Sequence, residues 1–221
     1  MVSSLHLCVL LGDVIESREI DDRRGLRTAI AAGIEVVNSE YSDALYAPMS
    51  MIRGIDEIGG ALTTVNPLYA IIRAINDRIF PHRFRFVLVL DEIDVHRDPP
   101  KIAAMDGPAF HHADQLLTTI ENESQYFAME TVDETTDTAI TNQINLLELL
   151  RESWTEKQHE AYTAYSQHDT QTAAATTLGV TQQTLSQRLR AIHWRQVRLS
   201  EASLSDQLES YGQRVSQHVY Y

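Results

Sequence analysis

The order of apolar patterns in the first 130 residues limits most strongly what this chain can fold into. A short apolar run over residues 4–11 predicts a buried strand. Apolar residues spaced by three and four over residues 21–41 predict an amphipathic helix, and two short apolar stretches within residues 46–64 predict a hairpin. The patterns that follow predict a helix, a strand, a helix and a strand over residues 66–80, 84–90, 106–121 and 124–132. Strands and helices therefore alternate in the order β-α-β-β-α-β, followed by one more helix and strand.

This order is that of the ferredoxin-like arrangement, in which helices cover one face of an antiparallel sheet. We therefore expect the first part of the chain to be an α+β domain of this kind. The best strand pattern, residues 84–90, ends at Asp91, and Asp13 directly follows the first strand pattern.

Charge divides the chain into unlike parts. The 221 residues include 18 basic and 31 acidic residues, a net charge of −13, and only two of the basic residues are lysine. Acid excess with scarce lysine resembles proteins from cells that keep molar salt in the cytoplasm, where screening removes most self-repulsion. Residues 151–198 differ, with 6 basic and 4 acidic residues. We expect a halophilic, archaeal origin, and an anion as the partner of residues 151–198.

Other features argue against several protein classes. No apolar run approaches the roughly 18 residues of a membrane span, and residues 1–4 lack the basic region of a signal peptide. The single cysteine, Cys8, excludes an intrachain disulfide and a cysteine-cluster metal site. We expect a cytoplasmic protein with no membrane partner.

The C-terminal third has the pattern of three short helices around a tight turn. The helices are expected over residues 155–165, 170–178 and 182–197. Thr155 and Gln158 have the spacing of a capping box at the start of the first helix. Gly179 marks the turn, and Thr181 caps the third helix, whose inner face carries Leu185 and Leu189. Residues 174–186 resemble the helix-turn-helix of sigma-factor region 4 and related regulators.

We expect the third helix to be a recognition helix, which presents its N-terminal residues to base edges in the DNA major groove. Glutamine suits adenine, arginine suits guanine, and serine or threonine suits bases or phosphates. The residues expected to contact DNA are Thr181, Gln182, Gln183, Thr184, Ser186, Gln187, Arg188 and Arg190. The alternative is a three-helix bundle that contacts only protein.

Two further helices are predicted on either side of this motif. A connecting helix before it has an expected inner face of Ile140, Ile144, Leu147, Leu150 and Trp154. After it, apolar residues from Leu204 to His218 recur at steps of four and three, which predicts a short a/d seam. Either this seam pairs two copies over two DNA half-sites, or the helix packs back on its own domain.

Carboxylates are expected at neighbouring strand ends. Asp13 follows the first strand, and Asp56 lies in the hairpin that this arrangement places beside it. Paired carboxylates can hold divalent cations that bind nucleotide phosphates, so Asp13 and Asp56 are candidate metal ligands, with Mg²⁺ and a nucleotide as candidate cofactors. The constellation resembles the palm of nucleotidyl and diguanylate cyclases. Alternatively, Asp13 only ends a strand and Asp56 lies at a solvated hairpin tip.

Three motifs together resemble the SatD family over most of residues 4–198. They are Leu-Gly-Asp-Val-Ile-Glu-Ser-Arg at residues 11–18, Arg-Gly-Ile-Asp-Glu-Ile-Gly-Gly at residues 53–60 and Asp-Gly-Pro-Ala-Phe at residues 106–110, with the C-terminal helix-turn-helix. The resemblance implies no defined activity. The family's usual Gly-Asp-Glu hairpin is altered, because Ile55 separates Gly54 from Asp56.

The sequence thus predicts an α+β fold in three parts. Residues 1–137 form a ferredoxin-like, cyclase-palm-like sensor or dimerisation domain, residues 138–198 a connecting helix and helix-turn-helix, and residues 199–221 an amphipathic helix. The expected function is a dimeric, sequence-specific transcriptional regulator of double-stranded DNA, with a small molecule or nucleotide as candidate ligand and without catalysis. The rival hypotheses are a metal-dependent nucleotide enzyme and a protein-contact module.

Overall fold

The structure, a computed structural model, describes residues 5–94 and 100–220. Residues 1–4, on which the signal-peptide argument and the predicted start of the first strand fall, lie outside this part. The chain divides into two compact units. We call residues 1–145 with 204–221 the sheet unit, and residues 146–203 the helical unit. No helix in the described part of the chain is long and apolar enough to cross a membrane.

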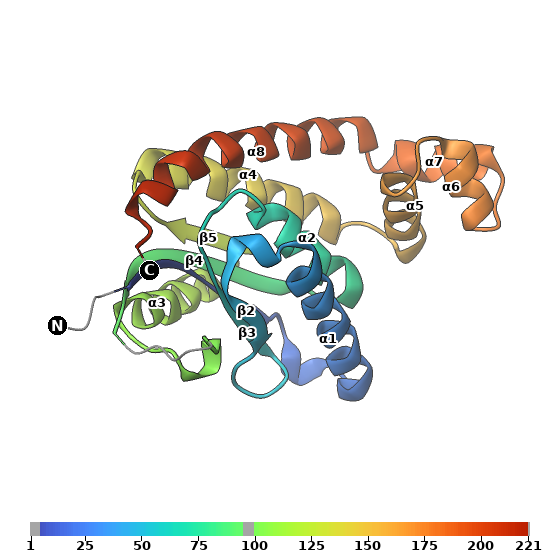
Figure 1. The fold of residues 1–221 in the computed structure, drawn as a ribbon. Helices are drawn as coiled ribbons and strands as arrows, with labels where there is room; N and C mark the ends of the chain where they lie inside the picture. The colour runs from blue at the N-terminus through green and yellow to red at the C-terminus, as the bar shows by residue number, and fades with distance from the viewer. Residues whose placement is uncertain (1–4, 95–99, 221) are drawn as a thin grey trace. The chain divides into compact units, whose positions relative to one another are not determined.

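The chain is a mixed α+β protein built on one five-stranded sheet (Figure 1). The strands are β1 (Leu5–Val14), β2 (Leu45–Met51), β3 (Glu57–Leu62), β4 (Phe84–Ile93) and β5 (Phe127–Glu130). They lie in the order β2-β3-β1-β4-β5, antiparallel except for the parallel pair β4–β5. The predicted order of strands and helices is therefore confirmed.

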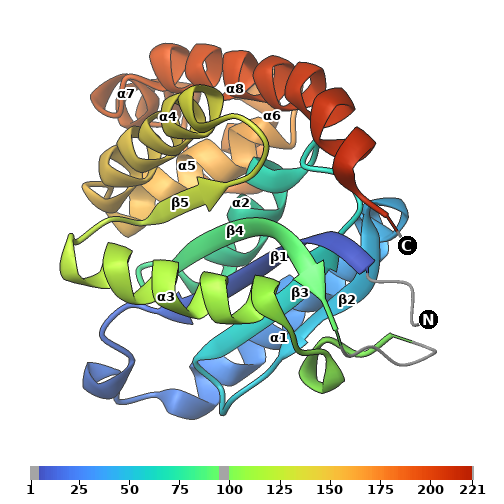
Figure 2. The ribbon, with the colours of Figure 1, turned by 90° about the vertical axis from the view of Figure 1, so that its left-hand side faces the viewer.

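Helices cover both faces of this sheet. The long helices of the sheet unit are α1 (Arg23–Glu40), α2 (Leu68–Ile79), α3 (Pro108–Asn122) and the first part of α4 (Glu134–Glu152). Short 3₁₀ turns are η1 (Ser17–Glu19), η2 (Ser42–Ala44), η3 (Ile102–Ala104) and η4 (Ser216–His218). In Figure 2, α3 lies in front of the sheet and α1 lies behind it. The expectation of helices on one face was therefore incomplete, because α3 covers the other face.

Alternation along β1 explains why the second face is also covered. Leu5, Leu7, Val9 and Leu11 are all buried, and they join one core with residues of α3 such as Ala109 and Ala113. The intervening residues Cys8 and Leu10 are also fully buried, on the opposite side of the strand. A strand that is apolar on both faces needs cover on both.

Two strands extend beyond their apolar runs. The sequence places Asp13 and Asp91 after strand ends, but β1 reaches Val14 and β4 reaches Ile93. Asp13 lies opposite Glu57 on β3 and opposite Arg85 on β4, and Asp91 lies opposite Leu7. Both predicted strand ends were wrong, because backbone pairing with a neighbouring strand continues through polar residues.

Side chains of α4 satisfy the outer edge of β5. Asn145 Oδ1 accepts the backbone N–H groups of Tyr126 (2.7 Å) and Phe127 (3.1 Å), and Thr141 Oγ1 accepts that of Met129 (3.2 Å). Asp137 accepts the N–H of Thr131. Because these acceptors recur every four residues, one helix face binds the whole strand edge, which would otherwise be open to pairing with another strand.

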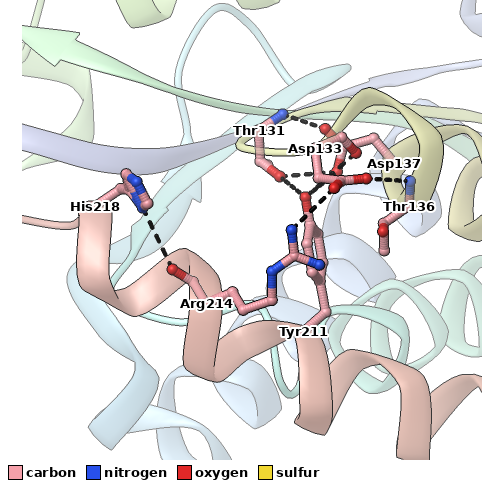
Figure 3. A network of polar contacts seen from close by, with 7 residues as sticks. All are labelled: Thr131, Asp133, Thr136, Asp137, Tyr211, Arg214 and His218. Atoms are coloured by element: carbon pink, nitrogen blue, oxygen red, sulfur yellow. Dashed lines mark hydrogen bonds and ion pairs between the residues drawn. The ribbon is translucent and has the colours of Figure 1, made fainter.

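The C-terminal half of α8 (Trp194–Val215) packs on the sheet unit through the same carboxylate (Figure 3). Tyr211 donates its hydroxyl to Asp137 Oδ1 at 2.9 Å, and Arg214 forms an ion pair with Asp133 at 2.9 Å. The predicted seam residues Leu204, Leu208, Tyr211 and Val215 are all buried within this chain, whereas His218 is exposed. From residue 204 onward, the apolar face of the predicted amphipathic segment 199–221 is thus used inside the sheet unit, which is the second of the two alternatives for this seam.

The helical unit contains α5 (Glu156–Ser166), α6 (Gln171–Thr177), α7 (Gln182–Ala191), the last turns of α4 and the first turns of α8. The capping box of Thr155 and Gln158 is confirmed. The predicted third helix is two helices, because His193 adopts φ 52° and α8 begins at Trp194. Leu150, predicted to face inward, is 51% exposed.

We predict that Asp137→Ala lowers the free energy of unfolding by about 2–4 kcal/mol, because several donors lose a buried charged acceptor. Tyr211→Phe keeps the buried ring and removes only the hydroxyl, so we expect about 1 kcal/mol. Urea unfolding of both variants, followed by circular dichroism, measures these losses. Equal stability of Asp137→Ala and the natural protein would contradict the role of this carboxylate.

Candidate functional site

The first candidate site is the outer surface of α7. Thr181 caps this helix, with its hydroxyl oxygen accepting the backbone N–H of Thr184 at 3.1 Å. Leu185 and Leu189 are fully buried, so the opposite face of the helix points to solvent. Gly179 makes the preceding turn with φ 63°, a conformation that favours glycine.

The predicted DNA-contacting residues differ in how far their side chains are exposed to solvent. Thr181, Gln182, Gln183, Gln187 and Arg190 are exposed, whereas Thr184, Ser186 and Arg188 are partly buried. Gln182 Nε2 donates to Gln171 Oε1 of α6 at 2.9 Å, and Arg190 donates to Ser186 Oγ at 3.3 Å. The sequence indicated this surface, but not the contacts that already engage Gln182 and Arg190.

The electrostatics of this surface differ from those of the rest of the chain. Between residues 161 and 198 there are four arginines and one carboxylate, Asp169, in a chain of net charge −13. Arg195 lies 5.4 Å from the centre of the Trp194 ring, and Arg198 lies 5.7 Å from that of Tyr165. Aromatic rings therefore support these two cations at the start of α8.

The second candidate site is the carboxylate pair Asp13 and Asp56. Both lie at the same end of the sheet, where Val14 N–H donates to the Asp56 carbonyl oxygen at 2.9 Å. Burial raises the pKa of Asp13 to about 6; Arg85 opposes this rise, and Asp56 and Glu121 add to it. Burial likewise raises the pKa of Glu57, a neighbour that the sequence did not single out as a ligand.

The residues present fit a divalent cation poorly. The buried side chain of Arg85, which is 9% exposed, lies on the strand position opposite Asp13 and forms an ion pair with Glu121 at 3.0 Å. The Asp56 carboxylate already accepts a hydrogen bond from Ser17 Oγ at 3.0 Å. Within the described residues, no group of three or more histidine, cysteine, aspartate or glutamate side chains could hold a metal ion. An internal guanidinium therefore supplies positive charge beside Asp13.

A cleft of about 470 Å³ is lined by Glu57, the chain neighbour of Asp56, but not by Asp13 or Asp56 themselves, and all three sequence motifs contribute to it. Leu11 comes from the first motif, Arg53 and Glu57 from the second, and Asp106 and Phe110 from the third. Arg53 lies 3.5 Å from Glu57 and 3.6 Å from Asp114 of α3. Motifs far apart in sequence thus form one polar-rimmed cleft, which the motif spacing alone did not predict.

The backbone of the third motif requires a glycine at Gly107. Its φ is 147°, and a Cβ atom there would lie 2.6 Å from the backbone nitrogen of Asp94. Only glycine fits this close approach of α3 to the end of β4.

These features define a mixed α+β protein whose sheet unit is joined to a small helical unit. The chain matches the model of the SatD family over residues 7–207, and it belongs to that family. No curated protein matches the chain. A solved structure of a bacterial light-regulated adenylyl cyclase is similar, with a TM-score of 0.41 and 11% sequence identity, covering 57% of this chain. The similarity spans 43% of that protein's length.

We predict that Asp13→Asn stabilises the protein at about pH 7.5 and has no effect near pH 4. The pKa of Asp13 is raised from 3.8 to about 6, so the folded state binds this proton more tightly than the unfolded state. The stability that this group contributes is therefore lost as pH rises from about 4 to about 6. We expect a gain of about 1–2 kcal/mol, less than the full shift because Asp13 keeps contact with water.

Urea unfolding at the two pH values measures this effect, with Asp206→Asn as an exposed control of equal charge change. Destabilisation by Asp13→Asn at pH 7.5 would show that Arg85 makes the charged form of Asp13 favourable.

Proposed function

We propose that this SatD-family protein is a sequence-specific DNA-binding transcriptional regulator, in which α6 and α7 form a helix-turn-helix. The observation that carries the proposal is α7 itself. A capped helix with an apolar inner face, Leu185 and Leu189, presents an uncharged polar outer face, chiefly Gln183 and Gln187. Glutamine side chains of this kind match the donor and acceptor pattern of adenine in the major groove.

Charge supports the same proposal. The segment from residue 161 to residue 198 combines four arginines with one carboxylate, so it is attractive to an anionic duplex in an otherwise acidic chain. If the cells hold molar salt, as the composition suggests, counterion release contributes little to affinity. Base contacts must then supply more of the binding free energy.

For the sheet unit we propose a ferredoxin-like, cyclase-palm-like domain that serves ligand sensing. Its support is the cleft in which the three sequence motifs meet, which is lined by apolar residues such as Leu11 and Phe110 and by charged residues such as Arg53. Such a cleft is the usual form of a small-molecule site.

We predict that Gln183→Ala with Gln187→Ala weakens binding to the preferred duplex by about 1–3 kcal/mol for each glutamine replaced. The preferred duplex comes from DNA pulldown with the tagged protein in its own cells, followed by fluorescence anisotropy at matched salt. Gln213→Ala, an exposed glutamine of the sheet unit, is the control and should bind as the natural protein does. Undiminished binding by the double variant would contradict this interface, and a flat pulldown profile would favour a protein-contact module.

The rival proposal, a nucleotide-dependent enzyme, draws on the carboxylates beside the cleft. It requires that Mg²⁺ with ATP or GTP binds residues near Asp13 and Asp56, despite Arg85. Calorimetry with these nucleotides tests it, with Asp13→Ala as the variant. Binding and turnover that Asp13→Ala abolishes would establish this rival.

We propose that a homodimer forms through the outward face of α4 in the helical unit. Leu146, Leu149 and Leu150 are 62%, 53% and 51% exposed. The only ionisable residue between residues 138 and 150 is Glu148, and its side chain is buried. Two copies that each carry a net charge of −13 can meet on this uncharged face without opposing carboxylates.

We predict that Leu149→Glu makes the protein monomeric, because it introduces two like charges into that interface. Light scattering coupled to size exclusion at high salt measures the mass. Leu199→Glu, another exposed leucine at 71%, is the control and should leave the mass unchanged. A dimer that survives Leu149→Glu would place the interface elsewhere.

A further inference from the structure

A pocket of about 520 Å³ opens at the C-terminal end of α7 in the helical unit. We call it the α7–α8 pocket; its lining residues are Gln171, Ser186, Arg190, His193, Trp194, Arg195 and Gln196. No carboxylate is among them, in a chain with 31 acidic residues. Its two arginine side chains can only donate hydrogen bonds, its serine and glutamine side chains can donate or accept, and the Trp194 indole also lines it.

The turn between α7 and α8 creates this arrangement. His193 adopts φ 52° and ends one helix directly before the next begins at Trp194. Arg190, on the last turn of α7, and Arg195, on the first turn of α8, therefore line the same pocket from two helices. Two guanidinium groups without a competing carboxylate favour an anion, and planar guanidinium forks match the geometry of phosphate oxygens.

The position of the pocket on α7 suggests which phosphate it takes. A recognition helix contacts base edges with its N-terminal residues, and its later turns leave the groove towards the sugar-phosphate backbone. Arg190 is the ninth of the ten residues of α7, and it donates a hydrogen bond to Ser186 Oγ at 3.3 Å. Both side chains line the pocket, whereas Gln183 and Gln187 do not.

We propose that the α7–α8 pocket binds a backbone phosphate of duplex DNA, and that Arg190 and Ser186 position α7 on the duplex without reading its bases. This inference rests on the proposed DNA-binding function. It removes Ser186 and Arg190 from the set of α7 residues proposed to read bases. It also adds Arg195, which lies on α8 outside the helix-turn-helix, to the proposed DNA interface.

The test measures affinity for the preferred duplex and for a scrambled duplex over a series of KCl concentrations. Arg190→Gln and Arg195→Gln should weaken binding to both duplexes by the same factor. Each should also reduce the slope of log affinity against log salt by about 1. Gln183→Ala should lower the ratio between the two duplexes and leave the slope unchanged. Arg24→Gln, an exposed arginine of the sheet unit, is the charge-matched control and should change neither.

The outcomes distinguish failure of the proposed DNA-binding function from failure of the phosphate assignment alone. If the natural protein binds neither duplex, the proposed function itself fails. If it binds and Arg190→Gln alters preference at one base pair with an unchanged slope, Arg190 reads a base and the phosphate assignment is overturned. Equal binding by the Arg190→Gln/Arg195→Gln double variant and the natural protein would overturn it as well.

Trp194 gives a direct readout of the pocket. Its fluorescence should change on addition of duplex DNA, and Trp194→Phe should abolish that change. Inorganic phosphate and a mononucleotide, added alone, serve as the competing sources of the same anion. Saturation by either at a lower concentration than duplex DNA would overturn the assignment in favour of a small phosphate ligand.

Discussion

A single buried carboxylate, Asp137, holds three parts of the sheet unit in place. It accepts hydrogen bonds from the backbone and hydroxyl of Thr131 at the end of β5, and from the Tyr211 hydroxyl on α8. Burial raises the pKa of Asp137, and these three hydrogen bonds offset part of that rise. Because Asp137 lies in the first turn of α4, its side chain links the start of α4 to the end of β5 and to α8. The Arg214–Asp133 ion pair and the buried side chains of Leu204, Leu208 and Val215 hold α8 on the sheet unit together with this carboxylate.

In the helical unit, an ion pair plays a similar part in joining the helices. Arg151, near the end of α4, forms an ion pair with Glu201 of α8 at 3.3 Å, and Tyr162 of α5 donates its hydroxyl to the same glutamate. The Arg151 guanidinium also lies 4.8 Å from the centre of the Trp154 ring. These contacts join the entering and returning helices within the unit. The short helices α6 and α7 bury small and leucine side chains, and much of the polar surface of α7 stays exposed.

The periodicity of the sequence predicted the order of strands and helices. It did not predict features that depend on strand pairing or on contacts between distant residues. Alternating strand and helix patterns indicated the order of the elements, because each pattern reports a buried face. They did not reveal that β1 continues through Asp13, since a neighbouring strand pairs with polar residues as readily as with apolar ones. His193 carries no turn signal, so the break before α8 was not predicted. The spacing from Leu204 to Val215 correctly indicated an apolar seam, but a seam buried within the chain and one between copies have the same pattern.

The placement of positive charge bears on the choice between the proposed DNA reader and its rival, a nucleotide-dependent enzyme. In the sheet unit, the Arg85 side chain is buried and forms an ion pair with the exposed carboxylate of Glu121, so its charge is already paired within the chain. In the helical unit, Arg190 and Arg195 are exposed and line a pocket that contains no carboxylate. An enzyme that handles nucleotide phosphates needs available cations beside its carboxylates, whereas a DNA reader needs them beside its recognition helix. Arg53 lines the cleft of the sheet unit, but it is paired with Glu57 and Asp114. The lining of the α7–α8 pocket offers its arginines no such carboxylate, which supports the proposed DNA reader.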